Sequence, residues 1–315
     1  MSYRLRDFGS YFVGGRVRRE TEGAPYTVNF TRSASYEVDP RGHFAIEHGY
    51  VQYFIPEARN DAPPVVLVHG GGMSGSCWET TPDGRPGWLH LLLRAGFEVH
   101  VLDNVERGRA GFAPGEWGRE WAGEPLLRSM EEAWALFRLG PPDGFAARAA
   151  FAGQLFPIAA LETFARSFVP RWLGTGGLQT QVLVDLLART GPAHVICHSQ
   201  GGEITFDAHA KAPDAFASII ALEPSGSPAD IAQLGETPLC CVMGDFLDIN
   251  DLWRARRAAW ERLAEAPRGN LIGPRDLGSG NSHMLMQDAN SELVFSTVLR
   301  WLKAKSIERR SHERR

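Results

Sequence analysis

The chain has 315 residues, which suits one large domain or one domain that carries an insertion. Apolar residues make up 43% and charged residues 22%, and this ordinary globular balance excludes a disordered, fibrous or disulfide-stapled chain. The 33 basic and 37 acidic side chains give a net charge of -4, which excludes the strongly basic balance of a nucleic-acid-binding protein. We therefore expect a small uncharged molecule as the partner, and no nucleic acid.

The sequence gives no sign of a membrane segment. It lacks the run of about 18 apolar residues that a membrane span needs, and residues 1–7 lack the apolar centre of a signal peptide. The four cysteines include no metal-type Cys-x-x-Cys pair. We expect a protein of the reducing cytoplasm that binds no membrane, or a periplasmic or secreted protein if a signal peptide has been removed.

The first clear element in chain order is an alternation of apolar and polar residues at 44–55, which predicts an antiparallel strand. Short continuous apolar runs, typical of strands buried on both faces, follow at 65–68, 99–102, 194–197, 218–222 and 239–243. Helical patterns lie between some of these runs, at 179–188 and 252–263. This order predicts an α/β fold with a mostly parallel central sheet flanked by helices.

The rhythm breaks at residues 104–176, where helical patterns at 126–139 and 157–169 follow loops rich in Gly and Pro. This segment holds 11 of the 26 Phe and Trp residues of the chain. Its rings predict either a small separate core or a lid whose rings line a pocket. We expect a core domain of residues 1–103 and 177–305, an inserted helical cap at 104–176, and a mobile charged tail at 306–315.

A candidate nucleophile lies in the sequence Cys-His-Ser-Gln-Gly at residues 197–201. The motif directly follows a predicted buried strand and precedes a helical pattern at 203–212. A serine on such a strand-to-helix turn is exposed at the carboxyl edge of the sheet, and the residues two positions away must be small. Gly201 meets this requirement fully and Cys197 approximately. The motif therefore predicts that Ser199 is a nucleophile, and the alternative is a serine that occurs in this loop by chance.

A candidate oxyanion hole lies upstream, where the sequence His-Gly-Gly-Gly at 69–72 follows the buried run 65–68. Acyl transfer passes through a negative tetrahedral intermediate, which backbone N–H groups stabilise by several kcal/mol. One donor is expected from Gln200, the residue after the nucleophile, and the other from Gly71 or Gly72.

The expected base is His283, which lies in a loop between the last predicted strand and a terminal helix at 288–303. His198 adjoins the nucleophile but leaves the turn in another direction, and His69 reads as structural. The acid belongs at the end of a strand after the nucleophile, which leaves Glu223 or one of Asp245 and Asp248.

Several longer strings resemble a known family. They are His69-Gly70, the sequence Trp-Glu-Thr-Thr-Pro-Asp-Gly-Arg-Pro-Gly-Trp at 78–88, His198-Ser199-Gln200, Glu223-Pro224, and Gly-Asn-Ser-His-Met-Leu-Met-Gln-Asp at 280–288. By these strings most of the chain, from about residue 8 to residue 302, resembles an α/β-hydrolase. More narrowly it resembles bacterial carboxylesterases whose triad acid is a glutamate after the sixth strand. Relatives can carry a cysteine pair where Gly71 and Gly72 stand, and this chain departs from them there.

The resemblance implies Ser199 as nucleophile, His283 as base and Glu223 as acid. We therefore expect a serine hydrolase that cleaves carboxylic esters with an apolar or aromatic group through an acyl-enzyme, without metal or organic cofactor. The expected pocket residues are Trp78, Trp117, Trp134, Phe137 and Met284. Lactone or amide cleavage by the same triad, a non-catalytic binding protein on this fold, and a homodimer stay open.

Overall fold

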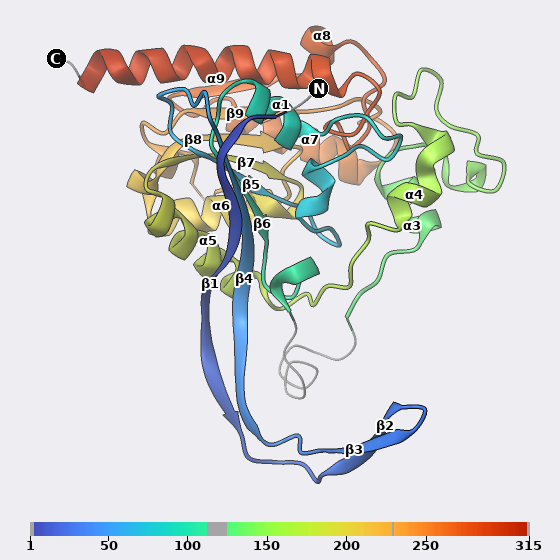
Figure 1. Cartoon of the computed structure of the whole chain (residues 1–315). Coiled ribbons are helices and arrows are strands. Elements are labelled where there is room, and N and C mark those ends of the chain that lie inside the picture. The colour runs from blue at the N-terminus through green and yellow to red at the C-terminus, as the bar shows by residue number, and fades with distance from the viewer. Residues whose placement is uncertain (1–2, 112–124, 229, 314–315) are drawn as a thin grey trace.

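The computed structural model describes residues 3–111, 125–228 and 230–313. These residues form an eight-stranded sheet of order β1-β4-β6-β5-β7-β8-β9-β10 and a separate two-stranded sheet of β2 and β3 (Figure 1). β4 runs antiparallel to β1 and β6, whereas the pairs from β6 to β10 are parallel. The expected α/β fold with a mostly parallel sheet is confirmed. The strands are β1 Leu5–Glu20, β2 Tyr26–Thr31, β3 Ala34–Val38, β4 Gly42–Pro56, β5 Val65–Val68, β6 Val99–Asp103, β7 Ala193–His198, β8 Phe216–Leu222, β9 Leu239–Val242 and β10 Gly269–Ile272.

Apolar side chains cover both faces of this sheet. Along β5, Val65 and Leu67 belong to one buried cluster and Val66 and Val68 to the other, because successive side chains of a strand point to opposite faces. The first cluster includes side chains of α1 Trp88–Arg94, α8 Pro274–Leu277 and α9 Ser291–Glu313, and the second those of α5 Gly176–Thr190, α6 Gln200–Lys211 and α7 Asp251–Leu263. Burial on both faces explains the continuous apolar runs of the sequence.

The five predicted buried strands are present as β5 to β9, with ends that differ from the prediction by at most two residues. The helical patterns at 179–188, 203–212 and 252–263 correspond to α5, α6 and α7. The sequence did not reveal β1, β10 or α1. The short 3-10 turns are η1 Gly75–Trp78, η2 Gly108–Ala110, η3 Pro142–Gly144, η4 Ile158–Ala160, η5 Pro213–Ala215 and η6 Ile231–Leu234.

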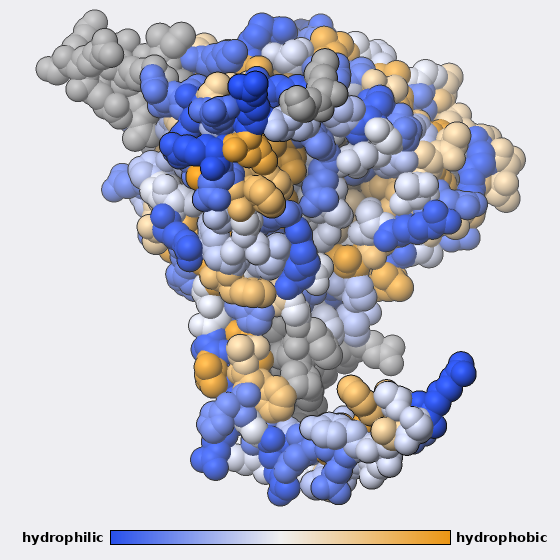
Figure 2. Space-filling model, viewed as in Figure 1, coloured by the Kyte–Doolittle hydropathy of each residue, from blue (hydrophilic) through white to orange (hydrophobic). Residues whose placement is uncertain are grey.

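β1 and β4 continue beyond the body of the molecule as a two-stranded arm, with the β2–β3 hairpin at its far end (Figure 1). β4 pairs with β6 only from Tyr50 to Phe54, so in the arm β4 is hydrogen-bonded to β1 alone among the strands of the main sheet. Figure 2 shows patches of apolar surface among hydrophilic atoms on the arm. Val17, Tyr26, Phe30 and Tyr36 of this region are 54–75% exposed. The predicted antiparallel strand at 44–55 is present as part of β4, whereas β1 is mostly exposed and its sequence lacks a clear burial pattern. The homodimer stays a prediction.

The segment between β6 and α5 contains α3 Met130–Leu136 and α4 Leu161–Ala165. Both helices are shorter than the patterns at 126–139 and 157–169 predicted. Two backbone hydrogen bonds, of 2.8 and 3.0 Å, join Leu126 to Arg171. Phe156 and Phe164 are buried and pack edge to face with ring centroids 5.1 Å apart. Part of the aromatic surplus therefore joins the buried cluster on one face of the main sheet. The role of this segment as a cap stays a prediction.

The terminal charged residues differ from the expectation. α9 reaches Glu313, so residues 306–313 are the last turns of a helix (Figure 1). Whether this helical end is mobile stays untested. None of the helices in the described ranges is long and apolar enough to cross a membrane.

Candidate active site

Ser199 lies on a strained turn between β7 and α6. Its φ of 50° and ψ of -119° are rarely adopted by a residue with a side chain. Three backbone hydrogen bonds hold the turn: Ser199 N donates to Leu222 O at 3.1 Å, and Ser199 O accepts from Gly202 N at 2.8 Å and from Ser225 N at 2.7 Å. The turn therefore has the geometry of the predicted nucleophile elbow.

Small residues flank this turn for a steric reason. A Cβ at Gly201 would lie 2.7 Å from His69 O and 3.0 Å from Val68 O, so the helix could not approach the neighbouring strand. On the other side, Cys197 is fully buried, and its thiol donates to Ile220 O at 3.7 Å. Burial raises the pKa of Cys197 to about 12, so the thiol stays neutral and fills space as a small apolar group.

The loop at 69–72 is held beside the elbow. His69 Nε2 accepts from Asn104 N at 3.1 Å, which leaves the proton on Nδ1 to donate to Gly70 O at 2.9 Å. Burial, together with the Arg107 charge, lowers the pKa of His69 to about 4, so the ring is neutral and structural as predicted. A Cβ on Gly71 would collide with the Arg171 guanidinium, and Gly72 takes a φ of 71°.

Glu223 and His283 form a buried pair. His283 Nδ1 donates to Glu223 Oε2 at 2.5 Å, and both side chains are almost entirely shielded from solvent. His283 and Ser199 line the same cavity, of about 340 Å³, together with Gly71 and Gln200. The structure therefore brings the predicted nucleophile, base, acid and oxyanion residues to one place.

The other two carboxylates that the sequence left open have different partners. Asp245 accepts from Phe246 N at 2.7 Å and from Gly280 N at 2.9 Å, so it fixes two loops. Asp248 pairs with Arg257 at the surface. This geometry favours Glu223 as the partner of His283.

Arg138 is a residue of this site that sequence reasoning missed. Its Nη2 and Nη1 lie 2.5 and 2.9 Å from the two oxygens of Glu223, its Nε donates to Asp245 O at 2.7 Å, and it stacks 4.2 Å from the Trp253 ring centroid. Burial alone would raise the pKa of Glu223, but the Arg138 charge and the His283 hydrogen bond lower it to about 2. Glu223 is therefore ionised at neutral pH.

The imidazole of His283 is enclosed by rings. Phe137 stacks on it at 5.5 Å, and Trp253 and His198 lie at centroid distances of 5.3 and 4.6 Å. Burial lowers the pKa of His283; Glu223 opposes this change, while the charges of Arg138 and Arg256 add to it. The ring is therefore neutral at pH 7, with Nδ1 protonated toward Glu223.

His198 supports the His283 loop. Its Nε2 lies 2.9 Å from His283 O, and burial lowers its pKa to about 3, so it is a neutral donor. The Asp288 carboxylate holds the same loop by accepting hydrogen bonds from Ser282 N at 2.7 Å, from Ser282 Oγ at 2.7 Å and from Asn281 Nδ2 at 2.9 Å. These bonds show that residues of the string at 280–288 fix the loop that carries His283.

The expected pocket residues divide into two groups. Phe137 lines the cavity, whereas Trp78, Trp134 and Met284 are buried in the core and do not. Trp78 packs on Trp88, and Trp134 Nε1 donates to Pro141 O at 2.9 Å. The expectation that these three residues line the pocket is therefore wrong. Large apolar side chains close to a loop can instead build the core that supports it. Trp117 lies outside the described residues.

The cavity wall contains both apolar and charged residues that the sequence did not indicate. Apolar surface comes from Leu136, Leu173 and Trp253 as well as Phe137. The charged residues are Arg128, Arg171, Arg256 and Glu203. In the described ranges, no group of three or more His, Cys, Asp or Glu residues could hold a metal ion.

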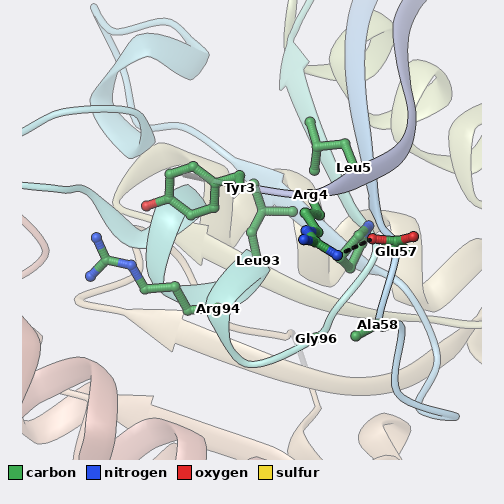
Figure 3. A pocket seen from close by; sticks show the side chains of 9 residues that line it. Tyr3, Arg4, Leu5, Glu57, Ala58, Leu93, Arg94 and Gly96 are labelled. Carbon is green, nitrogen blue, oxygen red and sulfur yellow. Dashed lines mark ion pairs between the residues drawn. The ribbon is translucent and has the colours of Figure 1, made fainter. Parts of the chain in front are cut away.

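A second cavity, of about 490 Å³, lies where β1 begins and where β4 and α1 end (Figure 3). Arg4 and Glu57 form an exposed ion pair of 4.0 Å at this cavity. Its lining includes neither the Ser199 elbow nor the Glu223–His283 pair. The smaller cavity above Ser199 is therefore the candidate active site.

Comparisons with known proteins agree with this geometry. A bacterial esterase described as novel, solved at atomic resolution, matches with a TM-score of 0.83 and 31% identity over 97% of this chain and 98% of that chain. The fold is that of the α/β-hydrolases. Within this fold the chain belongs to the family of that bacterial esterase.

A curated relative agrees at lower coverage. The probable secreted lipase phiG of Fungal sp. (strain ATCC 74256) is 29% identical over 237 residues, which cover 67% of this chain and 56% of the lipase. The chain thus matches little more than half of that relative's length. No protein-family profile matches the chain.

The close approach at Gly201 gives a first prediction. Gly201→Ala should lower the free energy of unfolding by about 1–3 kcal/mol, because its Cβ would press on two backbone oxygens that cannot easily move. Urea denaturation would measure the change. Gly177→Ala is the matched control, since nothing lies within 4 Å of a Cβ added there in α5; equal losses in both variants would contradict the steric argument.

A second prediction concerns Arg138. Arg138→Met should raise the pKa of His283, because it removes a cation that opposes the imidazolium and leaves the Glu223 charge less compensated. NMR titration of the ring resonances would measure the shift, with the surface variant Arg257→Met as control. An unchanged or lower His283 pKa in folded Arg138→Met protein would refute the claim that the Arg138 charge lowers the pKa of His283.

Proposed function

We propose that this protein is a serine hydrolase that cleaves carboxylic esters through an acyl-enzyme. The observation that carries the proposal is the buried Glu223–His283 pair, whose histidine lines the same cavity as the strained Ser199 turn. The family relationship to a bacterial esterase supports it independently. Lactone or amide substrates would use the same groups and are distinguished by a substrate panel.

In the proposed first half-reaction, Ser199 Oγ attacks the ester carbonyl and His283 Nε2 accepts its proton. Glu223 keeps the Nδ1 proton in place and stabilises the imidazolium that forms. The negative carbonyl oxygen accepts from the N–H of Gln200 and from that of Gly71 or Gly72. Gln200 is the first residue of α6, so its N–H has no acceptor within the helix.

Collapse of this intermediate breaks the ester bond, and His283 returns the proton to the leaving alcohol. Water then attacks the acyl-enzyme, His283 accepts a proton from the water, and the acid leaves as Ser199 is restored. Each step needs only protein groups and water, so the proposal includes no metal or organic cofactor.

The segment between β6 and α5 is proposed as the cap of this site. Its Phe137 stacks on His283, and its Val169 N donates to Gly72 O at 2.9 Å. Leu136, Phe137 and Trp253 give the cavity an apolar wall. We infer that this wall takes an apolar or aromatic part of the ester.

The nucleophile can be tested directly. Ser199→Ala should lower kcat on a short-chain para-nitrophenyl ester by at least about 1000-fold, because the acyl-enzyme cannot form. A fluorophosphonate should label the wild-type protein at Ser199, as located by mass spectrometry. Ser225→Ala, which removes another hydroxyl at the same cavity, should keep the label. An unlabelled Ser199 would favour a non-catalytic binding protein.

The pH dependence follows from the direction of the His283 shift. Because the neutral ring is the base and its pKa lies below the usual 6.5, kcat/KM should keep more than half of its maximum at pH 6.5 and fall tenfold per pH unit well below the lowered pKa. Glu223, with a pKa of about 2, stays ionised through this range. Initial rates between pH 4 and pH 8 would measure the profile; half-loss of kcat/KM above pH 6.5 would count against the assignment.

A further inference from the structure

The cavity above Ser199 is lined by more positive than negative charge. Three guanidinium groups, those of Arg128, Arg171 and Arg256, line it, and among the described lining residues Glu203 is the acidic one. They come from different parts of the chain: Arg128 and Arg171 lie 43 positions apart in the segment between β6 and α5, and Arg256 belongs to α7. Their convergence is therefore a property of the cavity and not of one charged helix face.

These guanidinium groups are only partly satisfied by the described residues. Arg128 pairs with the half-exposed Glu132 at 2.5 Å, Arg171 donates to Gln200 Oε1 at 3.1 Å, and Arg256 donates to Ser225 Oγ at 3.2 Å. The Nε of each arginine is buried and has no hydrogen-bond partner among the described residues. These Nε atoms are shielded from solvent, so the donors that an acceptor in the cavity can reach are the terminal guanidinium nitrogens of these arginines.

Arg138 shows what a fully paired arginine has in this protein. Its three guanidinium nitrogens all donate, two of them to Glu223 and one to a backbone carbonyl. The cavity arginines lack such a carboxylate pair within the cavity. Burial lowers the pKa of Arg171 and Arg256; the Arg128 charge lowers that of Arg171 further and the Arg138 charge that of Arg256, while Glu203 opposes the change in both.

We propose that the cavity takes esters that carry an ionised carboxylate in addition to the ester group, and that Arg171 and Arg256 bind this carboxylate. The proposal rests on the proposed ester hydrolysis. Guanidinium groups present paired N–H donors that match the two oxygens of a carboxylate. The hydrocarbon between the two groups lies against Leu136, Phe137 and Trp253, so the substrate is a small amphiphilic ester acid.

Paired substrates test this specificity. For a charge on the acyl side, the mono-para-nitrophenyl ester of adipic acid is compared with methyl para-nitrophenyl adipate, in which the free carboxylate is methylated. For a charge on the alcohol side, the acetate of para-hydroxybenzoic acid is compared with the acetate of its methyl ester. Rates are corrected for uncatalysed hydrolysis, and the readout is the ratio of kcat/KM for the charged to the neutral member, in which general losses of catalysis cancel.

In the wild-type protein we expect this ratio to be at least about 10 in one of the two pairs. In Arg256→Gln and in Arg171→Gln it should fall by about tenfold, as the loss of a charged hydrogen bond predicts. Arg257→Gln is the matched control, because Arg257 follows Arg256 in α7 but pairs with the exposed Asp248. The ratio should remain unchanged in that control. Thermal unfolding would confirm that each variant is folded.

The outcomes separate this proposal from the one on which it rests. Ser199-dependent hydrolysis of the neutral esters without a preference for the charged member in either pair overturns the carboxylate site and leaves the esterase proposal intact. Equal losses on charged and neutral esters in the arginine variants also overturn it. If Ser199→Ala still hydrolyses both the charged and the neutral esters, the proposal that Ser199 is the nucleophile is overturned.

Discussion

The carboxylate of Glu223 is fully buried, and an unpaired ion in such a place would be too costly to keep. It is kept ionised by His283 Nδ1, by two nitrogens of Arg138 and by Gly244 N at 2.7 Å. Glu223 and His283 belong to loops at the edge of the sheet, whereas the compensating cation comes from the segment between β6 and α5. Phe137 of the same segment also accepts from His283 N at 3.1 Å. The segment between β6 and α5 is therefore part of the structure that holds the buried pair, and without Arg138 the Glu223 carboxylate would lose its compensating cation.

Two neighbouring parallel strands present their functional residues in the same way. Ser199 follows β7 and Glu223 follows β8, and both adopt positive φ angles, of 50° and 42°. Each is still bonded to the next strand: Ser199 N donates to Leu222 O, and Glu223 N donates to Val242 O at 2.8 Å. The last ladder bond thus fixes the backbone while the positive φ turns the side chain out at the carboxyl edge. The strain, of about 1–3 kcal/mol at each residue, is offset by the surrounding sheet.

The sequence predicted what depends on short stretches of chain. Apolar runs such as 65–68 indicate a doubly buried strand, and Ser199 could be singled out because one strand, one turn and one helix define its geometry. Glu223 could not be separated from Asp245 and Asp248 by residue type, because their different partners lie on distant loops. Arg138 lies 85 positions from Glu223, and no local pattern indicates that contact. Trp78 shows the complementary error, because an apolar ring has the same sequence signal in a core as in a pocket.

Net charge has the same limitation as a guide to the site. The excess of acidic side chains is summed over the whole molecule, and exposed charges separated by more than about 10 Å are largely screened from one another in 0.1 M salt. Buried guanidinium groups are screened much less, so a few of them set the potential inside a cavity whatever the surface carries. A value of -4 excludes a strongly basic chain, yet it is compatible with three arginines around Ser199. The expectation of an uncharged partner followed from composition, and the arrangement of charge in the cavity argues for an anionic one.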